Sequence, residues 1–261
     1  MKKILFLLFI TACQPNAPVR PLSNAHAHND YMHDRPLLDA LDNGFASVEA
    51  DVHLIDGKLL VTHDAPENPA DVGTLEEMYL APLKKHIEQN NGEMYKGYNG
   101  SFYLMVDFKT EAISTYIALK EILAKYESIL TVVYKGSEQK NGPVKVFISG
   151  NRPISEVMQE EVNLATLDGR PEDLGKNIPS MYMPVVSQNV NSFLTWTGVG
   201  EVDQEEKKNF IAFINKVHDE NKKVRLWATP DTPEAWEFLL ESGVDFINTD
   251  RLSDLKDFLS K

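Results

Sequence analysis

Segments of strand length alternate with segments of helical periodicity from residue 21 to the end of the chain. Apolar runs such as "FASVEADVHL", "SFYLMVDFK", "VKVFISG" and "KVRLWAT" are separated by amphipathic stretches such as "EAISTYIALKEILAKY" and "QEEKKNFIAFINKVHDEN". A regular alternation of this kind predicts a parallel sheet covered by helices. About eight strand–helix units in roughly 240 residues match a closed barrel better than an open sheet. We therefore predict an α/β fold, a single-domain TIM (β/α)8 barrel over residues 21–261.

The start of the chain has a different pattern. Two lysines precede a short apolar run, residues 4–10, which is followed closely by Cys13, the only cysteine of the protein. This pattern is typical of a secretory signal and is too short to span a bilayer as a mature helix. With Cys13 at its end it resembles the lipobox of bacterial lipoproteins. We expect a signal peptide at residues 1–12 and a lipidated tether at 13–20. The protein would then be exported across the inner membrane and lipid-anchored in the periplasm or at the cell surface. An ordinary signal peptide with a chance cysteine is the alternative.

The chain is acidic. Its formal net charge is −13, and the charge becomes −15 without residues 1–12, because these residues carry two lysines and no acid. Such a surface repels nucleic acid and anionic lipid at long range, so we do not expect a nucleic-acid partner. A local basic pocket for one phosphate is compatible with this charge. A single cysteine cannot form an intrachain disulfide, so the core must supply the stability.

Acidic side chains end two of the predicted strands, at the position where TIM barrels carry their functional groups. Glu49 and Asp51 are separated by one residue on a strand and therefore point to the same face. Two buried carboxylates need a cation, and Asp107 ends the next long strand as a third carboxylate. Oxygen ligands of this kind suit Mg²⁺ or Ca²⁺ rather than zinc. A salt-bridge cluster at the rim, with Lys109, is the alternative.

Histidines end the flanking strands. His28 and His63 are expected on either side of the acidic strand ends, where a pair of imidazoles can supply a general base and a general acid at neutral pH. His26 shares a face with His28 if its strand is regular, and we expect it to support the site rather than to react. His53 lies past the expected end of its strand, so we expect it at the rim.

The order of these motifs resembles that of the phospholipase-C-like phosphodiesterase superfamily. The segments "HNDY", "VEADVHLIDGKLLVTHD", "VDFK" and "VRLWATPDTPEAWEFLLESGVDFINTDRL" are similar to successive motifs of that superfamily. Its members include glycerophosphodiester phosphodiesterases and phosphoinositide-specific phospholipases C. The chain looks closest to the branch that includes the altered-inheritance-of-mitochondria proteins. The resemblance covers residues 21–109 and 223–255 with specific motifs.

The resemblance implies a TIM barrel, one divalent cation, Mg²⁺ or Ca²⁺, and a mechanism with two histidines. By position it implies His28 and His63 as acid and base, the metal ligands Asn29, Glu49, Asp51 and Asp107, and the substrate-binding residues Lys109 and Trp227. The usual His-Arg-Gly motif of glycerophosphodiesterases reads His28-Asn29-Asp30 here, so its phosphate-binding arginine is missing. We expect Arg152, after the "FISGN" strand, or Lys109 to bind the phosphate in its place.

The predicted activity is metal-dependent hydrolysis of a glycerophosphodiester or a phospholipid-type substrate, with a small phosphodiester or lipid head group as the binding partner. A lyase or phosphomonoesterase reaction at the same metal site is a second hypothesis. A lipid-anchored barrel that binds a ligand without turning it over is a third. The joint presence of His28, His63, Glu49 and Asp51 argues against the third hypothesis, because a decayed site would usually have lost at least one of them.

Overall fold

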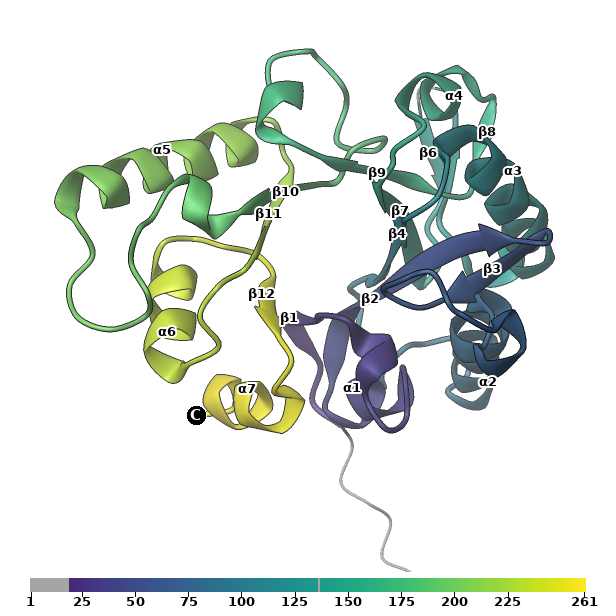
Figure 1. Cartoon of the computed structure of the whole chain (residues 1–261), viewed down its shortest axis with the longest axis horizontal. Coiled ribbons are helices and arrows are strands. Elements are labelled where there is room, and N and C mark those ends of the chain that lie inside the picture. Colours follow the sequence, from purple (N-terminus) through teal and green to yellow (C-terminus); the bar gives the residue numbers. More distant parts are fainter. Residues whose placement is uncertain (1–18, 136) are drawn as a thin grey trace, which may run out of the picture.

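The computed structural model describes residues 19–135 and 137–261. Within these residues, parallel strands form a ring with helices on its outside (Figure 1). Neighbouring strands of the ring follow one another along the chain, and the last strand pairs with the first. The strands are β1 (Leu22–Ala27), β2 (Phe45–Ile55), β4 (Phe102–Phe108), β7 (Val144–Gly150), β9 (Thr166–Gly169), β10 (Val185–Asn189), β11 (Lys223–Trp227) and β12 (Ile247–Thr249).

The ring closes between β11 and β12, where a single parallel bridge joins Arg225 to Phe246. This nearly closed eight-stranded parallel barrel confirms the predicted TIM barrel. Because all strands run in the same direction, their C-terminal ends meet at one face of the molecule. The polar side chains that end the strands are therefore brought to one rim.

Helices cover the outer face of the strands. They are α1 (Leu38–Asp42), α2 (Ala81–Gln89), α3 (Ala112–Leu123), α4 (Ile154–Gln159), α5 (Gln204–Asp219), α6 (Pro233–Glu241) and α7 (Leu252–Leu259). The side chains of Asp203 and Thr232 cap α5 and α6 by accepting hydrogen bonds from backbone N–H groups of the first turn. Shorter helical turns are η1 (Asp30–Met32), η2 (Pro69–Asp71), η3 (Glu76–Leu80), η4 (Ala124–Ile129), η5 (Pro171–Asp173) and η6 (Val190–Ser192).

Four further strands lie outside the ring. β3 (Lys58–Val61) pairs with β2 as an antiparallel hairpin, which carries the end of β2 beyond the barrel. The strands β5 (Val132–Tyr134), β6 (Ser137–Lys140) and β8 (Val162–Asn163) form a small separate antiparallel sheet. The sequence predicted the β2–β3 hairpin from its Asp56-Gly57 turn, and the small sheet was not predicted.

The barrel has two apolar layers. One lies between strands and helices, where side chains such as Val48, Val106 and Trp236 are buried, each large side chain contributing about 1.5–3 kcal/mol. The other fills the barrel interior and consists of Met105, Phe147, Val185 and Phe246, with Tyr103 packed against them. This inner layer closes the middle of the barrel, so the polar side chains near the rim lie above an apolar floor.

Two expected elements differ from the structure because of proline. The strand expected over "SMYMPVVS" begins only at Val185, directly after Pro184, which has no N–H to donate to a neighbouring strand. The helix expected over "TLEEMYLAPLKKHIEQNN" is divided into a π-helical turn, η3, and the regular helix α2. Pro82 lies in the first turn of α2, where its missing N–H costs little.

Candidate active site

A cavity of about 340 Å³ lies at the C-terminal ends of the strands. It is lined by side chains from most of the barrel, namely His28, Asn29, Glu49, Asp51, His63, Asp107, Lys109, Ser149, Arg170, Gln188, Arg225 and Trp227. The structure therefore brings together every residue that the sequence assigned to catalysis or metal binding, together with Lys109 and Trp227.

Three carboxylates form a cluster on β2 and β4. Asp51 and Asp107 are direct neighbours in the parallel register, and Glu49 lies two residues earlier on the same face of β2. Each of the three offers an oxygen within 4.8 Å of the others. Lys109 lies between two of them, with its Nζ 3.0 Å from Asp51 Oδ2 and 3.1 Å from Asp107 Oδ1. The rim salt bridge considered as an alternative is therefore present, but it engages only part of the cluster.

The remaining oxygens of the cluster fit a hard cation. Asp51 Oδ1 is buried and has no hydrogen-bond partner among the described residues. Burial and the neighbouring charge of Glu49 raise the pKa of Asp51 above its ordinary value, despite the opposing effect of Lys109. Tyr31 donates to Asp51 Oδ2 and contacts Asn29 Oδ1 at 3.0 Å, so the amide oxygen of Asn29 lies beside the cluster. Carboxylate and amide oxygens are the ligands that Mg²⁺ and Ca²⁺ prefer.

His28 follows β1 and is held by an acid that follows the neighbouring strand, β12. Its Nδ1 lies 2.9 Å from Asp250 Oδ1, which fixes the plane of the ring, and its Nε2 lies 3.9 Å from Glu49 Oε2. Burial lowers the pKa of His28, but the hydrogen bond to Asp250 and the charge of Glu49 outweigh this effect and raise it above 6.5. An oriented imidazole of this kind can exchange protons near neutral pH.

His63 lies after β3, at the open side of the cavity. Its side chain is 58% exposed, and its Nδ1 lies 3.3 Å from Asp64 Oδ1. The backbone carbonyl of His63 lies 3.1 Å from the Nε2 of His53, a buried side chain on β2. His53, expected at the rim, is thus buried and holds the segment that carries His63.

His26 lies below the cavity and is fully buried. Its Nδ1 contacts Ser47 Oγ at 2.7 Å, and its Nε2 accepts a hydrogen bond from Arg225 Nε at 3.1 Å. Burial and the charge of Arg225 lower the pKa of His26 to about 4, so the ring is neutral at pH 7. Arg225 in turn donates to Glu49 Oε2 at 2.7 Å. This chain of contacts would let His26 support the site through Arg225, a residue that the sequence analysis did not select.

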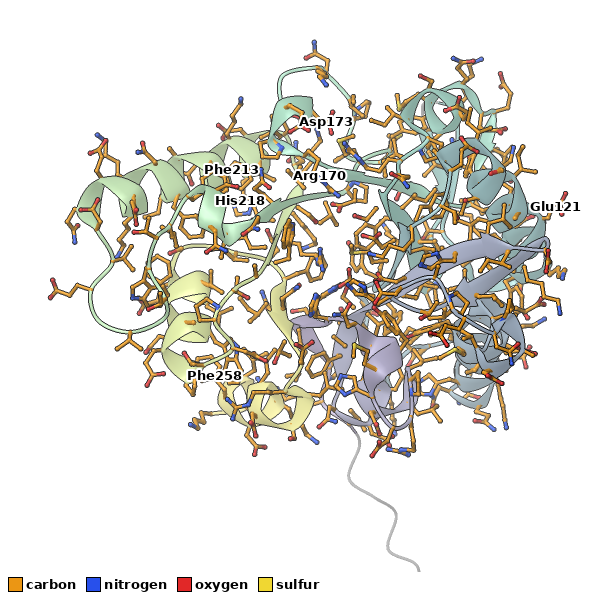
Figure 2. All side chains as sticks on the ribbon, viewed as in Figure 1. Glu121, Arg170, Asp173, Phe213, His218 and Phe258 are labelled. Atoms are coloured by element: carbon orange, nitrogen blue, oxygen red, sulfur yellow. The ribbon has the colours of Figure 1, made fainter. Side chains whose placement is uncertain are left out.

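Arg152, expected to bind phosphate, does not line the cavity. Its guanidinium donates instead to the carbonyl of Asp168 and to Asp173 Oδ2, both at 2.7 Å. Arg170, which follows β9, lines the cavity in its place. Figure 2 shows Arg170 on the inner side of the ring of strands and Asp173 farther from it. The interpretation of Arg152 failed because the loop after β7 turns its side chain towards η5, where two acceptors hold it.

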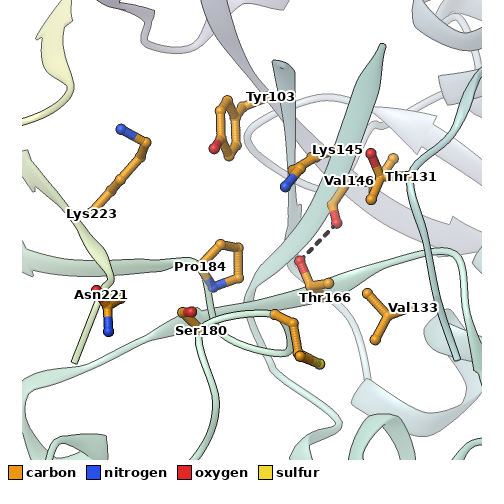
Figure 3. A pocket seen from close by; sticks show the side chains of 11 residues that line it. Tyr103, Thr131, Val133, Lys145, Val146, Thr166, Ser180, Pro184, Asn221 and Lys223 are labelled. Atoms are coloured by element: carbon orange, nitrogen blue, oxygen red, sulfur yellow. Dashed lines mark hydrogen bonds between the residues drawn. The ribbon is translucent and has the colours of Figure 1, made fainter. Parts of the chain in front are cut away.

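A second cavity, of about 260 Å³, lies at the opposite end of the barrel (Figure 3). It is lined by Tyr103, Thr131, Val133, Lys145, Val146, Thr166, Ser180, Met181, Pro184, Asn221 and Lys223. None of these described residues is a carboxylate or a histidine. Because acid–base and metal chemistry need such groups, the cavity at the C-terminal rim is the candidate active site.

A nearly closed parallel barrel that carries a three-carboxylate cluster and two histidines at its C-terminal rim agrees with the class that the motifs predicted, the phospholipase-C-like phosphodiesterases. Solved structures agree with this class at the level of the fold. A glycerophosphodiester phosphodiesterase from Parabacteroides distasonis superposes with a TM-score of 0.58 at 14% identity, over 92% of this chain and 98% of that chain. One from Agrobacterium tumefaciens gives a TM-score of 0.50 at 11% identity, over 92% of this chain and 100% of that chain.

The sequence places the chain more closely within this class. Residues 16–166 match the AIM6-like phosphodiesterase domain, and the chain belongs to this family. Altered inheritance of mitochondria protein 6 of Kluyveromyces lactis is 26% identical, over 91% of this chain and 72% of that protein. Its homolog in Arthroderma benhamiae is also 26% identical, over 89% of this chain and 82% of that protein. The superfamily and the branch predicted from the motifs are thus confirmed.

The predicted bacterial localisation is wrong. The curated relatives come from yeasts and other fungi, which are eukaryotes, whereas the prediction required a bacterial lipoprotein exported across an inner membrane. It depended on a short apolar run and on Cys13, and both lie outside the described residues, as does most of the expected tether. A pattern of so few residues says little about the cell in which it functions. Among the residues that the structure describes, no helix is long and apolar enough to cross a membrane.

Proposed function

We propose that this protein hydrolyses phosphodiesters of the glycerophosphodiester or phospholipid type, with one divalent cation, Mg²⁺ or Ca²⁺, bound by Asn29, Glu49, Asp51 and Asp107. The observation that carries the proposal is the meeting of this acidic cluster with His28 and His63 in one cavity. Membership in the phosphodiesterase family supports the reaction class. When bound, the cation would stabilise the negative charge that develops on the phosphoryl oxygens.

In the proposed mechanism the two histidines move the protons. One of His28 and His63 removes a proton from the attacking oxygen, which forms a new bond to phosphorus. The bond from phosphorus to the leaving oxygen then breaks, and the other histidine gives that oxygen a proton. Asp250 orients His28 for its part, and Lys109 is close enough to the cluster to bind a phosphoryl oxygen. The attacking oxygen is either water or a hydroxyl of the substrate, and the latter would give a cyclic phosphate first.

Phosphorus NMR on a panel of phosphodiesters tests this proposal. We expect cleavage of at least one glycerophosphodiester or lysophospholipid in the presence of Mg²⁺ or Ca²⁺, and its loss when a chelator is added. Phosphomonoesters in the same panel test the phosphatase alternative, and a cyclic product distinguishes a transfer reaction from direct hydrolysis. Binding of these compounds without any turnover, with both metals present, would favour the ligand-binding alternative and overturn the proposal.

A further inference from the structure

The two halves of the active-site cavity differ in charge. The half formed by β1 to β4 carries the acids and the two candidate catalytic histidines. The half formed by β7 to β11 carries Ser149, Arg170, Gln188, Arg225 and Trp227, and no acid lines the cavity there among the described residues. A phosphodiester has two substituents, so a substrate centred on the acidic half would extend one of them over the other half.

Arg170 is built into this second half rather than lying loosely at the surface. Its Nη1 donates to Asp168 Oδ2 at 2.6 Å and to the carbonyl of Gly169 at 2.9 Å, and its Nη2 donates to Ser149 Oγ at 2.9 Å. Asp168 is fully buried and also accepts hydrogen bonds from Ser149 and Ser187. The guanidinium therefore has a fixed orientation before any ligand arrives, which lowers the entropic cost of binding.

The donors of the guanidinium are not all used by these contacts. A guanidinium has five N–H donors, and the contacts described above occupy three of them. The side chain is 22% exposed and lines the cavity. By contrast, the Arg225 side chain is only 3% exposed and is directed at Glu49 and His26. Arg170 is thus the cation of this half that can receive a further acceptor from a ligand.

From this arrangement we propose that Arg170 and Gln188 form a subsite for an anionic substituent of the substrate, a carboxylate or a second phosphate. The inference rests on the proposed function, because it concerns the group attached to the phosphodiester that the site would cleave. A guanidinium binds carboxylate and phosphate oxygens through charge-assisted hydrogen bonds, which are stronger than neutral ones. Gln188 lines the same half of the cavity, and its amide N–H group adds a neutral donor there.

A quaternary ammonium head group is the main competing occupant. The exposed face of Trp227 could attract such a cation. However, the described lining of the cavity offers a single aromatic side chain, and the fixed charge of Arg170 lies in the same half and repels a cation. The structure therefore favours an anionic head group over a choline head group.

Four glycerophosphodiesters that share one scissile group provide the test. Their head groups are glycerophosphate and glycerate, which are anionic, glycerol, which is neutral, and choline, which is cationic. We expect kcat/KM for at least one anionic ester to exceed that for the choline ester by about tenfold or more, the range of a charge-assisted hydrogen bond. Comparison of the glycerophosphate ester with the glycerate ester shows whether the subsite prefers a second phosphate or a carboxylate. Equal rates for all four esters, or a preference for choline, would overturn the inference and leave the proposed function intact.

Variants connect the preference to the residue. Arg170→Gln alone leaves buried Asp168 without its cation, so the double variant Asp168→Asn/Arg170→Gln removes both charges at similar size. We expect the anionic-to-neutral ratio of kcat/KM to fall to about one in the double variant. The matched control is Arg35→Gln/Asp39→Asn, a surface arginine–aspartate pair outside the cavity, which should keep the wild-type ratio. A similar fall of the ratio in both double variants would contradict a specific role of Arg170.

Calorimetry separates this inference from the proposed function. If wild type cleaves none of the four esters, binding of the same esters is measured at equal pH and metal concentration. Tighter binding of an anionic ester that is lost in Asp168→Asn/Arg170→Gln would retain the subsite and reject phosphodiester hydrolysis. No detectable preference in binding or in turnover would reject the subsite.

Discussion

Replacing Arg225 with methionine should destabilise the protein more than any surface charge change. Arg225 is 2% exposed and lies in the barrel interior, where its guanidinium contacts Glu49 Oε2 at 2.7 Å and His26 Nε2 at 3.1 Å. Burial raises the pKa of Glu49, but the positive charge of Arg225 leads the effects that outweigh this and hold it below its ordinary range. Methionine has a similar length and no charge. Arg225→Met would therefore leave Glu49 ionised and buried without its main partner.

The expected loss follows from the burial of both partners. Removing one member of a buried ion pair typically costs about 3–5 kcal/mol, because the remaining charge is uncompensated. His26 also loses the donor to its Nε2, which leaves a buried acceptor unsatisfied at about 1–3 kcal/mol. These two costs overlap, since both come from one group, so we expect a decrease of about 3–5 kcal/mol in the free energy of unfolding. Domains of this kind are usually stable by only about 5–15 kcal/mol.

Urea unfolding of four proteins measures this effect. Wild type, Arg225→Met, Glu49→Gln and the double variant form a double-mutant cycle, run in the presence of a chelator so that no cation replaces the arginine. The double variant should be more stable than Arg225→Met, because neither charge is left alone. The matched control is Arg35→Met, since Arg35 pairs with Asp39 and Asp42 at the surface, and its loss should lower the free energy of unfolding far less than Arg225→Met does.

The reasoning is refuted if Arg225→Met lowers the free energy of unfolding by less than about 1 kcal/mol, or if the cycle shows no coupling between Arg225 and Glu49. The same series also reports on the metal. Added Mg²⁺ or Ca²⁺ should stabilise Arg225→Met more than Arg225→Met/Glu49→Gln, because a ligand that binds only the folded state raises its stability. Equal stabilisation of both variants would argue against Glu49 as a metal ligand.

Three further outcomes are expected. His28→Ala and His63→Ala should each lower kcat by about 10²–10⁴ without unfolding the protein, and their effects should not add; full activity of either variant would remove it from the mechanism. Gly150→Ala should weaken metal binding and lower the free energy of unfolding, because at φ +65° the new Cβ would lie 2.4 Å from Asp107 Oδ1. The control is Gly57→Ala, where φ is also positive, at +76°, but the new Cβ would meet open space. Burial raises the pKa of Asp173, but its salt bridges lower it overall, so this carboxylate stabilises the fold above pH ~4 and less as pH falls. Asp173→Asn should therefore lower the free energy of unfolding, measured with urea, by about 1–3 kcal/mol at pH 7 and by clearly less at pH 3. An equal decrease at the two pH values would contradict this.

The sequence predicted the barrel and the acidic half of the site for the same reason. In β2 apolar residues alternate with Glu49 and Asp51, and in β4 a nearly continuous apolar run leads to Asp107. Glu49 and Asp51 share a face because side chains alternate along a strand, and the parallel register then places Asp107 beside Asp51. These arguments need only the local pattern and the direction of the strands. They offered a salt bridge with Lys109 only as an alternative to the metal, because its two ion pairs depend on how the side chains meet in space.

The other half of the site was missed except for Trp227, because its strands carry inward polar residues. β9 contains only Thr166–Gly169, and its Asp168 points into the barrel, so no apolar run indicates a strand before Arg170. In β11 the signal was present: Val224 and Leu226 face the helices and are fully buried, so Arg225 and Trp227 must face inward. A charged residue at an inward position of a barrel strand requires a buried counter-charge, and Glu49 was already predicted to be buried. The alternation of side chains in β11, together with the burial of Glu49, therefore indicates this ion pair, whereas Arg170 needs the structure, because its orientation depends on Asp168.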